Sequence, residues 1–181
     1  MKNKLAEIVF GGGCFWCTEA VFDALHGVED VVSGYAGGHV ENPSYMEVAA
    51  KQTGHAEVIK VVFDSEVIPF EKLLEIFFAF HDPTTLNRQG YDEGPEYRSI
   101  ILYNSAEQKS EIDKYILELG KQFTDKKIVT EVVELDKFYP AEEYHQKFYQ
   151  KNTGQPYCQI NIAPKLEKLR KHYSELLKKT D

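Results

Sequence analysis

The chain is organised around Ile8-Val9-Phe10-Gly11-Gly12-Gly13-Cys14-Phe15-Trp16-Cys17-Thr18-Glu19. Its first three residues are apolar and typical of the end of a β-strand, and three glycines follow them. Residues 19–25 then have apolar side chains at helical spacing and end before Gly27. The sequence therefore predicts a strand, a glycine turn and a helix, with Cys14 at or just before the first helical turn.

This position of Cys14 favours a reactive thiol. Unpaired backbone N–H groups and the positive end of the helix dipole stabilise an anion at a helix start, and the thiolate is the reactive form of cysteine. Phe15 and Trp16 follow directly, and they suggest an aromatic wall for a small apolar group. The alternative interpretation is a buried, inert cysteine in a tight turn, with both aromatic residues in the core.

The composition limits the classes of function. The chain has 181 residues, of which 43% are hydrophobic and 13% aromatic, so we expect one domain with a substantial core. Its net charge of -8 argues against nucleic acid as a partner, because phosphates need a basic face. No window approaches the roughly 20 apolar residues of a membrane span, and residues 1–7 lack the apolar region of a signal peptide. We expect a cytoplasmic monomer without a membrane partner.

The cysteines point to redox chemistry. Three cysteines are too few, and an odd number, for a secreted disulfide framework, and in a cytoplasmic chain they are better explained as catalytic or redox thiols. Cys14 and Cys17 have the Cys-x-x-Cys spacing of thiol–disulfide oxidoreductases. A zinc site would need a second such pair, and only Cys158 remains, so we expect neither a metal nor another cofactor.

The rest of the chain alternates predicted strands and helices. We expect strands at 7–10, 28–32, 55–63, 97–103 and 128–135, a glycine-rich loop at 33–38, and helices from the cysteine turn to about 26 and at about 45–50, 70–80, 105–119, 139–151 and 164–179. Residues 84–96 are polar and aperiodic, which predicts a long functional loop. The order of elements favours an α+β sandwich, with helices on one face of a mixed sheet, over a doubly wound parallel sheet.

Several polar residues have two interpretations. Glu57 lies in the strand predicted at 55–63, where a solvent-exposed residue is the simpler interpretation. In an apolar cleft beside a cysteine, its carboxyl would instead have a raised pKa and could act as a general acid. Tyr45, Tyr97 and Asp92 could donate hydrogen bonds to a substrate oxygen, although the chain has eleven tyrosines.

Histidines give weaker signals. Glu142 and His145 have the spacing of half a carboxylate metal motif. A single copy is not a metal site, so a surface or capping role is the better interpretation. We interpret His55 and His81 as turn or packing residues.

Eight short strings occur in one order along the chain. They are GGCFWC at 12–17, GYAGG at 34–38, NPSY at 42–45, TGHAEV at 53–58, HDPT at 81–84, NRQG at 87–90, YRS at 97–99 and AEEYHQ at 141–146. Together they resemble the peptide methionine sulfoxide reductases of type A, which act on the S epimer of the sulfoxide. The resemblance covers residues 6–164. It implies a two-layer α+β sandwich with a ferredoxin-like plait core and long functional loops, in one domain (1–181) with a C-terminal helical extension (165–181).

The resemblance also assigns the substrate pocket. Phe15 and Trp16 match the aromatic pair that binds the methyl group. Tyr45 and Tyr97 match the oxygen-binding tyrosines, and Asp92 matches an aspartate on the polar side of the pocket. Position 91, commonly Asn in the family, is Tyr here, which could reshape the loop that carries the aspartate.

The same resemblance assigns the reacting groups. The family's nucleophile falls on Cys14 and its proton-donating glutamate on Glu57. The thiol that resolves the sulfenic acid varies in place across the family, and Cys158 matches the position used by a subset. Cys17 stands where most members have glycine. We rank Cys158 first and Cys17 as a backup or second relay thiol, because residues 152–156 include glycine and proline and are flexible enough to swing a thiol onto the site.

The expected reaction is reduction of methionine S-sulfoxide, free or in proteins, to methionine. It would proceed through a sulfenic acid on Cys14 and an intramolecular disulfide that a thioredoxin-like donor reduces, and it would repair oxidative damage. Two alternatives stay open. One is a general thiol–disulfide oxidoreductase, and the other is a binding module stabilised by zinc or by a disulfide, in which Cys14 and Cys17 are structural.

Overall fold

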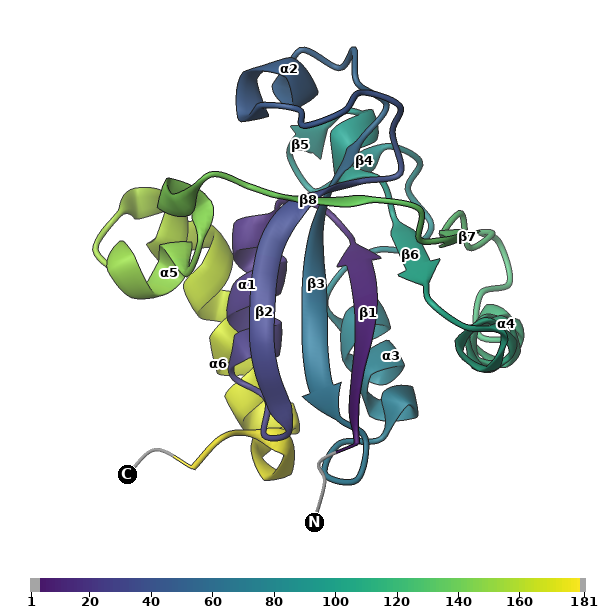
Figure 1. Ribbon diagram of the computed structural model, residues 1–181. Helices are drawn as coiled ribbons and strands as arrows, with labels where there is room; N and C mark the ends of the chain where they lie inside the picture. Colours follow the sequence, from purple (N-terminus) through teal and green to yellow (C-terminus); the bar gives the residue numbers. More distant parts are fainter. Residues whose placement is uncertain (1–3, 180–181) are drawn as a thin grey trace.

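The structure, a computed structural model, describes residues 4–179 (Figure 1). A six-stranded sheet with the order β7-β6-β1-β3-β2-β8 forms its centre. Its strands are β1 (Leu5–Gly11), β2 (Val28–Ala36), β3 (Ala56–Asp64), β6 (Ile100–Tyr103), β7 (Glu131–Glu134) and β8 (Phe138–Pro140). Neighbouring strands are antiparallel except β6 and β7, so the sheet is mixed, as predicted.

Helices and short turns connect these strands. The helices are α1 (Phe15–Asp23), α2 (Tyr45–Ala49), α3 (Phe70–Ala79), α4 (Ala106–Gly120), α5 (Phe148–Lys151) and α6 (Ala163–His172). The 3₁₀ turns are η1 (Pro95–Tyr97), η2 (Glu143–His145) and η4 (Ser174–Leu176), a π turn is η3 (Cys158–Ile162), and a small hairpin pairs β4 (Arg88–Gln89) with β5 (Asp92–Glu93). In Figure 1, α1, α3 and α6 lie behind β1, β2 and β3, on one face of the sheet. The protein is therefore α+β.

The core follows from the alternation of side chains along the strands. Ile8 and Phe10 of β1 point to the helical face, while Val9 belongs to a smaller cluster on the other face. The Phe10 ring stacks on Phe77 of α3 with ring centroids 4.7 Å apart. This packing fixes the end of β1, and hence the glycine turn that follows it, against α3.

Most predicted elements are confirmed within a few residues. Ser44 forms a capping box at the start of α2, and Ser105 caps α4. The polar segment 84–96 is irregular apart from the β4–β5 hairpin and the start of η1. Tyr97 lies in η1 instead of a strand, and β6 begins only at Ile100.

Three predictions were wrong. The glycine-rich loop expected at 33–38 is largely strand, because β2 continues to Ala36 and pairs there with β8. Gly34 permits this pairing, since a Cβ there would collide with the Phe138 ring and the Tyr139 carbonyl. The helix expected at 139–151 is instead β8, η2 and a short α5. The C-terminal helix, expected to reach 179, ends at His172.

A pair of long-range hydrogen bonds explains the second error. The Gln146 side chain accepts from Ser33 N at 3.0 Å and donates to Ser33 O at 2.8 Å. These two hydrogen bonds thus give Ser33 of β2 the partner that β8, which ends at Pro140, does not supply. Lys147 then takes a left-handed conformation with φ 52°, which separates this segment from α5. In residues 139–151, these tertiary contacts therefore outweigh the helical spacing of the sequence.

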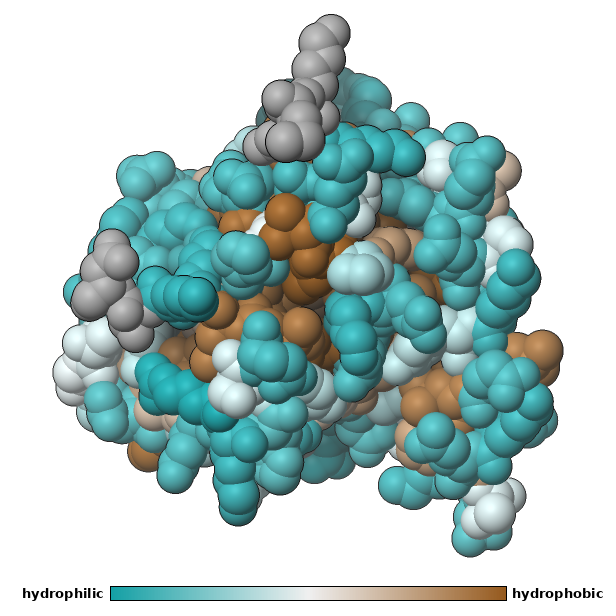
Figure 2. Space-filling view, turned by 90° about the horizontal axis from the view of Figure 1, so that it is seen from below, coloured by the Kyte–Doolittle hydropathy of each residue, from teal (hydrophilic) through white to brown (hydrophobic). Residues whose placement is uncertain are grey.

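Figure 2 shows the molecule from the end at which both termini lie. Apolar residues gather there in a hollow ringed by hydrophilic ones. Leu5, at the start of β1, and Val67, just after β3, are exposed. Because Cys14 follows the opposite end of β1, this hollow is remote from the cysteine turn. Among residues 4–179, no helix is both long and apolar enough to cross a membrane.

Candidate active site

Cys14 is the N-cap residue of α1, as predicted. Gly13 before it has φ +88°, a conformation that glycine adopts without strain. The Gly13 N–H donates to the Tyr97 carbonyl at 3.2 Å, and a Cβ on Gly13 would lie 2.9 Å from Gln89. The glycine turn therefore brings Cys14 against the segment that carries Tyr97.

The Cys14 thiol lies beside the Cys17 thiol, and both interact with the Tyr157 hydroxyl, whose oxygen is 3.7 Å from Cys17 Sγ. Burial raises the pKa of Cys14 well above its usual value, and the Cys17 thiol and the Glu57 carboxyl add to this effect. A hydrogen bond from Cys14 and the charge of Lys165 lower the pKa of Cys17 to about 7. Burial and the neighbouring thiol thus oppose the effect that the helix start is expected to have on the pKa of Cys14.

Glu57 is buried in β3, with its carboxyl directed at the start of α1. Its side chain accepts from the Phe15 N–H at 3.1 Å, and the residue is 3% exposed. Burial raises the pKa of Glu57 to about 8, with the charges of Asp92 and Glu96 contributing. The carboxyl is therefore mostly protonated at neutral pH. The simpler interpretation, a solvent-exposed strand residue, is wrong.

Three polar residues from separate elements surround this carboxyl. Burial raises the pKa of Tyr45 and of Tyr97, and the charges of Glu57 and Cys14 add to the shift of each phenol. Both phenols are therefore neutral donors. Burial also raises the pKa of Asp92 in β5, whose charge acts on Glu57 and Cys17.

The aromatic residues after Cys14 form one packed group. Phe15 is buried, and Trp16 stacks on Phe148 with ring centroids 3.6 Å apart and planes 5° apart. Trp16 Nε1 donates to His145 Nδ1 at 3.0 Å. The Tyr157 ring packs edge-on against the indole, with ring centroids 5.4 Å apart. These contacts fix the orientation of the indole beside the thiols.

The interpretation as surface or capping residues is wrong for His145, which is buried, and is confirmed for Glu142, which caps the start of α2. His145 is buried against Trp16, and Glu142 accepts from Tyr45 N and from Tyr35 Oη, each at 2.8 Å. Glu142 thus fixes the start of α2, which carries Tyr45. In the described part of the chain, no group of three or more His, Cys, Asp or Glu residues is arranged to hold a metal ion.

Cys158 opens η3 and is fully buried. Burial raises the pKa of Cys158, and the neighbouring charge of Cys17 adds to the shift. All three cysteines carry free thiols. The contacts therefore bring Cys14 and Cys17 together, with Tyr157 against both, and they connect Cys158 to this pair through Cys17.

Sequence reasoning missed Tyr157 and Lys165, although Tyr157 directly precedes Cys158. His81 was interpreted correctly, since its ring bonds Phe77 O at 2.6 Å and Ser99 Oγ at 2.7 Å within the packing. Tyr91 is fully exposed between β4 and β5, so it does not line the pocket. His55 likewise packs in a turn and accepts from Gly38 N at 3.0 Å.

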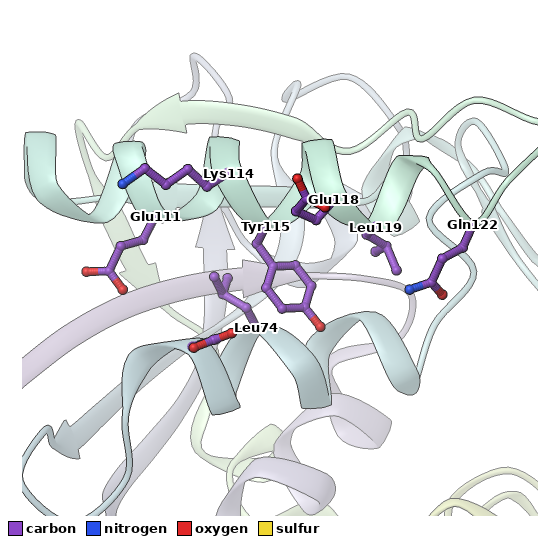
Figure 3. A pocket seen from close by; sticks show the side chains of 8 residues that line it. Leu74, Glu111, Lys114, Tyr115, Glu118, Leu119 and Gln122 are labelled. Carbon is purple, nitrogen blue, oxygen red and sulfur yellow. The ribbon is translucent and has the colours of Figure 1, made fainter.

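Figure 3 shows a groove between α3 and α4 with a volume of about 370 Å³. Leu74, Tyr115 and Leu119 supply its apolar side chains, and charged groups surround them. None of the residues assigned to the pocket lines this groove. It is therefore separate from the thiol site.

Comparisons with known proteins agree with one another. The family model "Peptide methionine sulfoxide reductase" matches residues 6–177. The chain is 54% identical over 172 residues to the MsrA of Trichodesmium erythraeum (94% of this chain, 97% of that protein) and 53% identical over 165 residues to that of Sulfolobus acidocaldarius (91% and 93%). Reduced Mxr1 from Saccharomyces cerevisiae superposes with a TM-score of 0.79 at 34% identity (87% and 91% covered). Mxr1 in complex with Trx2 gives 0.57 at 28% identity (82% and 87%).

Proposed function

Because the chain belongs to the peptide methionine sulfoxide reductase family, we propose that it reduces methionine S-sulfoxide to methionine with Cys14 as the nucleophile. The observation that carries this assignment is the buried, protonated Glu57 carboxyl at the helix start that bears the thiol. A proton donor and a nucleophile then meet in one apolar pocket. The family match favours this reaction over a general disulfide reductase and over a zinc-stabilised module.

Each part of the sulfoxide group faces side chains of complementary chemistry in the proposed pocket. Phe15 and Trp16 offer an apolar surface to the methyl group. Glu57, Tyr45 and Tyr97 offer hydrogen-bond donors to the oxygen. Donors placed where negative charge develops stabilise the transition state. Burial keeps Glu57 protonated, and the charge of Asp92, on the polar side of the pocket, adds to this effect.

The reaction then follows from the protonation states. Cys14 hydrogen-bonds to Cys17, whose lower pKa lets it hold the negative charge in the free enzyme. When Cys14 passes its proton to Cys17, the Cys14 thiolate attacks the sulfoxide sulfur. The attack joins the Cys14 sulfur to the methionine sulfur, and Glu57 donates its proton to the oxygen. The hydroxyl group then moves to the Cys14 sulfur as its bond to the methionine sulfur and the new sulfur–sulfur bond break, so that methionine leaves and Cys14 is left as a sulfenic acid.

A second thiol must condense with the sulfenic acid. The sequence ranked Cys158 first, but the contacts favour Cys17, which lies beside Cys14, whereas Cys158 is buried in η3. We propose that Cys14 and Cys17 form the first disulfide and that Cys158 exchanges into it later. A thioredoxin-like protein is the proposed final reductant, since the related Mxr1 has been solved in complex with Trx2.

The finer architecture is also a proposal. The run β1-α1-β2-β3-α3-β6 with the strand order β6-β1-β3-β2 supports a ferredoxin-like plait, to which β7 and β8 add strands at the edges. The family match extends into the C-terminal segment, which supports one domain over residues 1–181. The net charge of -8 supports a monomer that binds neither nucleic acid nor anionic membranes, and the free cysteines support a place in the cytoplasm.

The decisive experiment is turnover of the two separated epimers of a blocked methionine sulfoxide with dithiothreitol as reductant. We expect the S epimer to be consumed and the R epimer to persist. Cys14→Ser should release no methionine even in a single turnover, because no other thiol would act as the nucleophile. A wild-type burst in Cys14→Ser, or equal use of both epimers, would refute the assignment.

A further inference from the structure

Lys165 of α6 is fixed beside the thiol pair. Its Nζ donates to the Phe80 carbonyl at 3.0 Å, just past the end of α3. Lys165 and Cys17 line the same small cavity, together with His81 and apolar side chains, and its volume is about 10 Å³. A space of this size holds at most about one water molecule. One side of Lys165 therefore meets Cys17 across a space too small for bulk water, while Lys165 also lines an open groove with Lys168.

The groups that face Cys17 come from several elements. They are Cys14 at the start of α1, Glu57 of β3, Asp92 of β5, Tyr157 and Cys158 around the start of η3, Lys165 of α6, and His81 across the cavity. Burial lowers the pKa of His81 to about 4, and burial keeps Glu57 protonated by raising its pKa to about 8, so both are neutral near pH 7. Lys165 is the cation among these groups, and the negative charge of Asp92 opposes its effect on the pKa of Cys17.

From this arrangement we propose that Lys165 and Tyr157 hold the Cys17 thiol ionised and directed at Cys14, so that Cys17 closes the first disulfide. The inference rests on the proposed function, because the sulfenic acid must first form on Cys14. The Cys17 thiolate attacks the Cys14 sulfur, an S–S bond forms, and the S–O bond breaks. The departing hydroxide takes up the proton that Cys17 released on ionising and leaves as water.

Both residues act through the thiol and do not touch the substrate. Lys165 supplies a positive charge, and the Tyr157 hydroxyl supplies a hydrogen bond to the sulfur at 3.7 Å. A thiol attacks fastest when its pKa lies near the ambient pH, because the thiolate fraction and the intrinsic nucleophilicity then balance. Lys165 and Tyr157 are thus positioning residues for the second step, while Glu57 acts in the first.

The test is a pH titration of thiolate ultraviolet absorbance in the reduced protein. Cys17→Ser should remove the first titration and thereby assign it. Lys165→Met should move the midpoint up by about one pH unit, which lowers the thiolate fraction about tenfold below the midpoint. Lys165→Arg should restore the midpoint. Lys168→Met is the matched control, because Lys168 also donates to a carbonyl at the end of α3, that of Ala79.

Rapid quenching after one equivalent of sulfoxide gives a second readout. The amount of methionine released in the burst should be unchanged in Lys165→Met, because Cys14 and Glu57 remain, whereas loss of the second thiol should slow about threefold near pH 6. The slowing is smaller than tenfold because the more basic thiolate is intrinsically about threefold more nucleophilic. Tyr157→Phe should move the midpoint in the same direction and tests the inference at a second residue.

An unchanged midpoint in both Lys165→Met and Tyr157→Phe would overturn the proposal. So would an equal shift in Lys168→Met, or a first-formed bond between Cys14 and Cys158 in the wild-type protein. Failure to release methionine has a different meaning, since it would refute the proposed function and leave the titration of Cys17 unaffected.

Discussion

Glu57 is held neutral by its surroundings. The sheet removes the carboxyl from water, and among residues 4–179 the Phe15 N–H alone donates a hydrogen bond to it, which is too little to compensate a buried charge. Asp92 and Glu96 raise the cost of ionisation further. Glu57 therefore acquires acid chemistry from desolvation, whereas Glu29 on the neighbouring strand β2 is exposed to solvent.

Glu57→Gln keeps a donor for the substrate oxygen but has no proton to give. The single-turnover rate of methionine release should fall about 10²- to 10⁴-fold, the usual value of general acid catalysis. In the wild-type protein this rate should fall as the pH rises through about 8, where the glutamate loses its proton. Stopped-flow measurements across this range, with Glu29→Gln as control, check both expectations. A pH-independent rate would contradict the acid role.

The same carboxyl should make stability depend on pH. Its folded pKa of about 8 lies above the usual 4.5, so the folded state holds a proton that the unfolded state releases between these values. The free energy of unfolding should therefore fall as the pH rises through this window, by up to about 5 kcal/mol. Urea unfolding near pH 5 and near pH 9 measures this slope. In Glu57→Gln the free energy of unfolding should change less with pH. An equally steep pH dependence in this variant would show that another group titrates.

At the level of elements, α2 depends on a side chain distant in sequence. Ser44 caps this five-residue helix, and Glu142 accepts from the Tyr45 N–H and from the Tyr35 hydroxyl of β2. A helix this short gains little from its own hydrogen bonds. Its position, and with it the position of Tyr45, is therefore set by the segment between β8 and α5.

Glu142→Ala tests this dependence. It leaves the Tyr35 hydroxyl without its partner and frees the start of α2, so unfolding free energy should fall by about 1–3 kcal/mol. The kcat/KM for methionine sulfoxide should fall about tenfold, equivalent to about 1.4 kcal/mol of transition-state stabilisation. Chemical denaturation and steady-state kinetics measure these effects. Glu143→Ala is the control, since its exposed side chain pairs only with Lys151; similar losses in both variants would contradict the specific role.

Elements with local signals were predicted correctly from the sequence, and those set by distant contacts were not. The strand, glycine turn and helix around Cys14 follow from adjacent residues. The segment after β8 could not be predicted, because Gln146 completes the β2 edge at Ser33, 113 residues away. The same difference between local signals and distant contacts explains which residues of the candidate site could be predicted. Short strings identified Cys14 and Glu57, whereas the roles of Tyr157 and Lys165 follow only from the contacts of the folded chain.

At the level of the whole molecule, the C-terminal segment folds back onto the cysteine turn. Tyr157 reaches Cys17 across 140 residues of sequence, and Cys158 follows it as the first residue of a π turn. A π turn departs from regular helical hydrogen bonding and is common at functional sites. In the proposed cycle the buried Cys158 side chain must leave its position to enter the exchange, whereas residues 153–156 and 159–160 on either side of it are already exposed.

Cys158→Ser should separate reduction from recycling. The single-turnover yield of methionine should stay intact, because Cys14 and Cys17 remain, whereas turnover driven by thioredoxin should fall by at least about tenfold. Mass spectrometry of trapped thiols over time should show the Cys14–Cys17 bond first. Cys17→Ser is the matched variant and should lose that first bond. A Cys158→Ser protein that turns over normally with thioredoxin would remove Cys158 from the relay.

Trp16 is the only tryptophan of the chain, and it lies between Phe148, His145 and Tyr157. Nearly all light that the protein emits after excitation of indole therefore originates at one wall of its own pocket. A bound methyl group, a new sulfur–sulfur bond or an opened C-terminal segment would each change the polarity or the quenching around that ring. The enzyme thus carries an intrinsic optical reporter, and its successive steps can be followed in real time without attaching a dye.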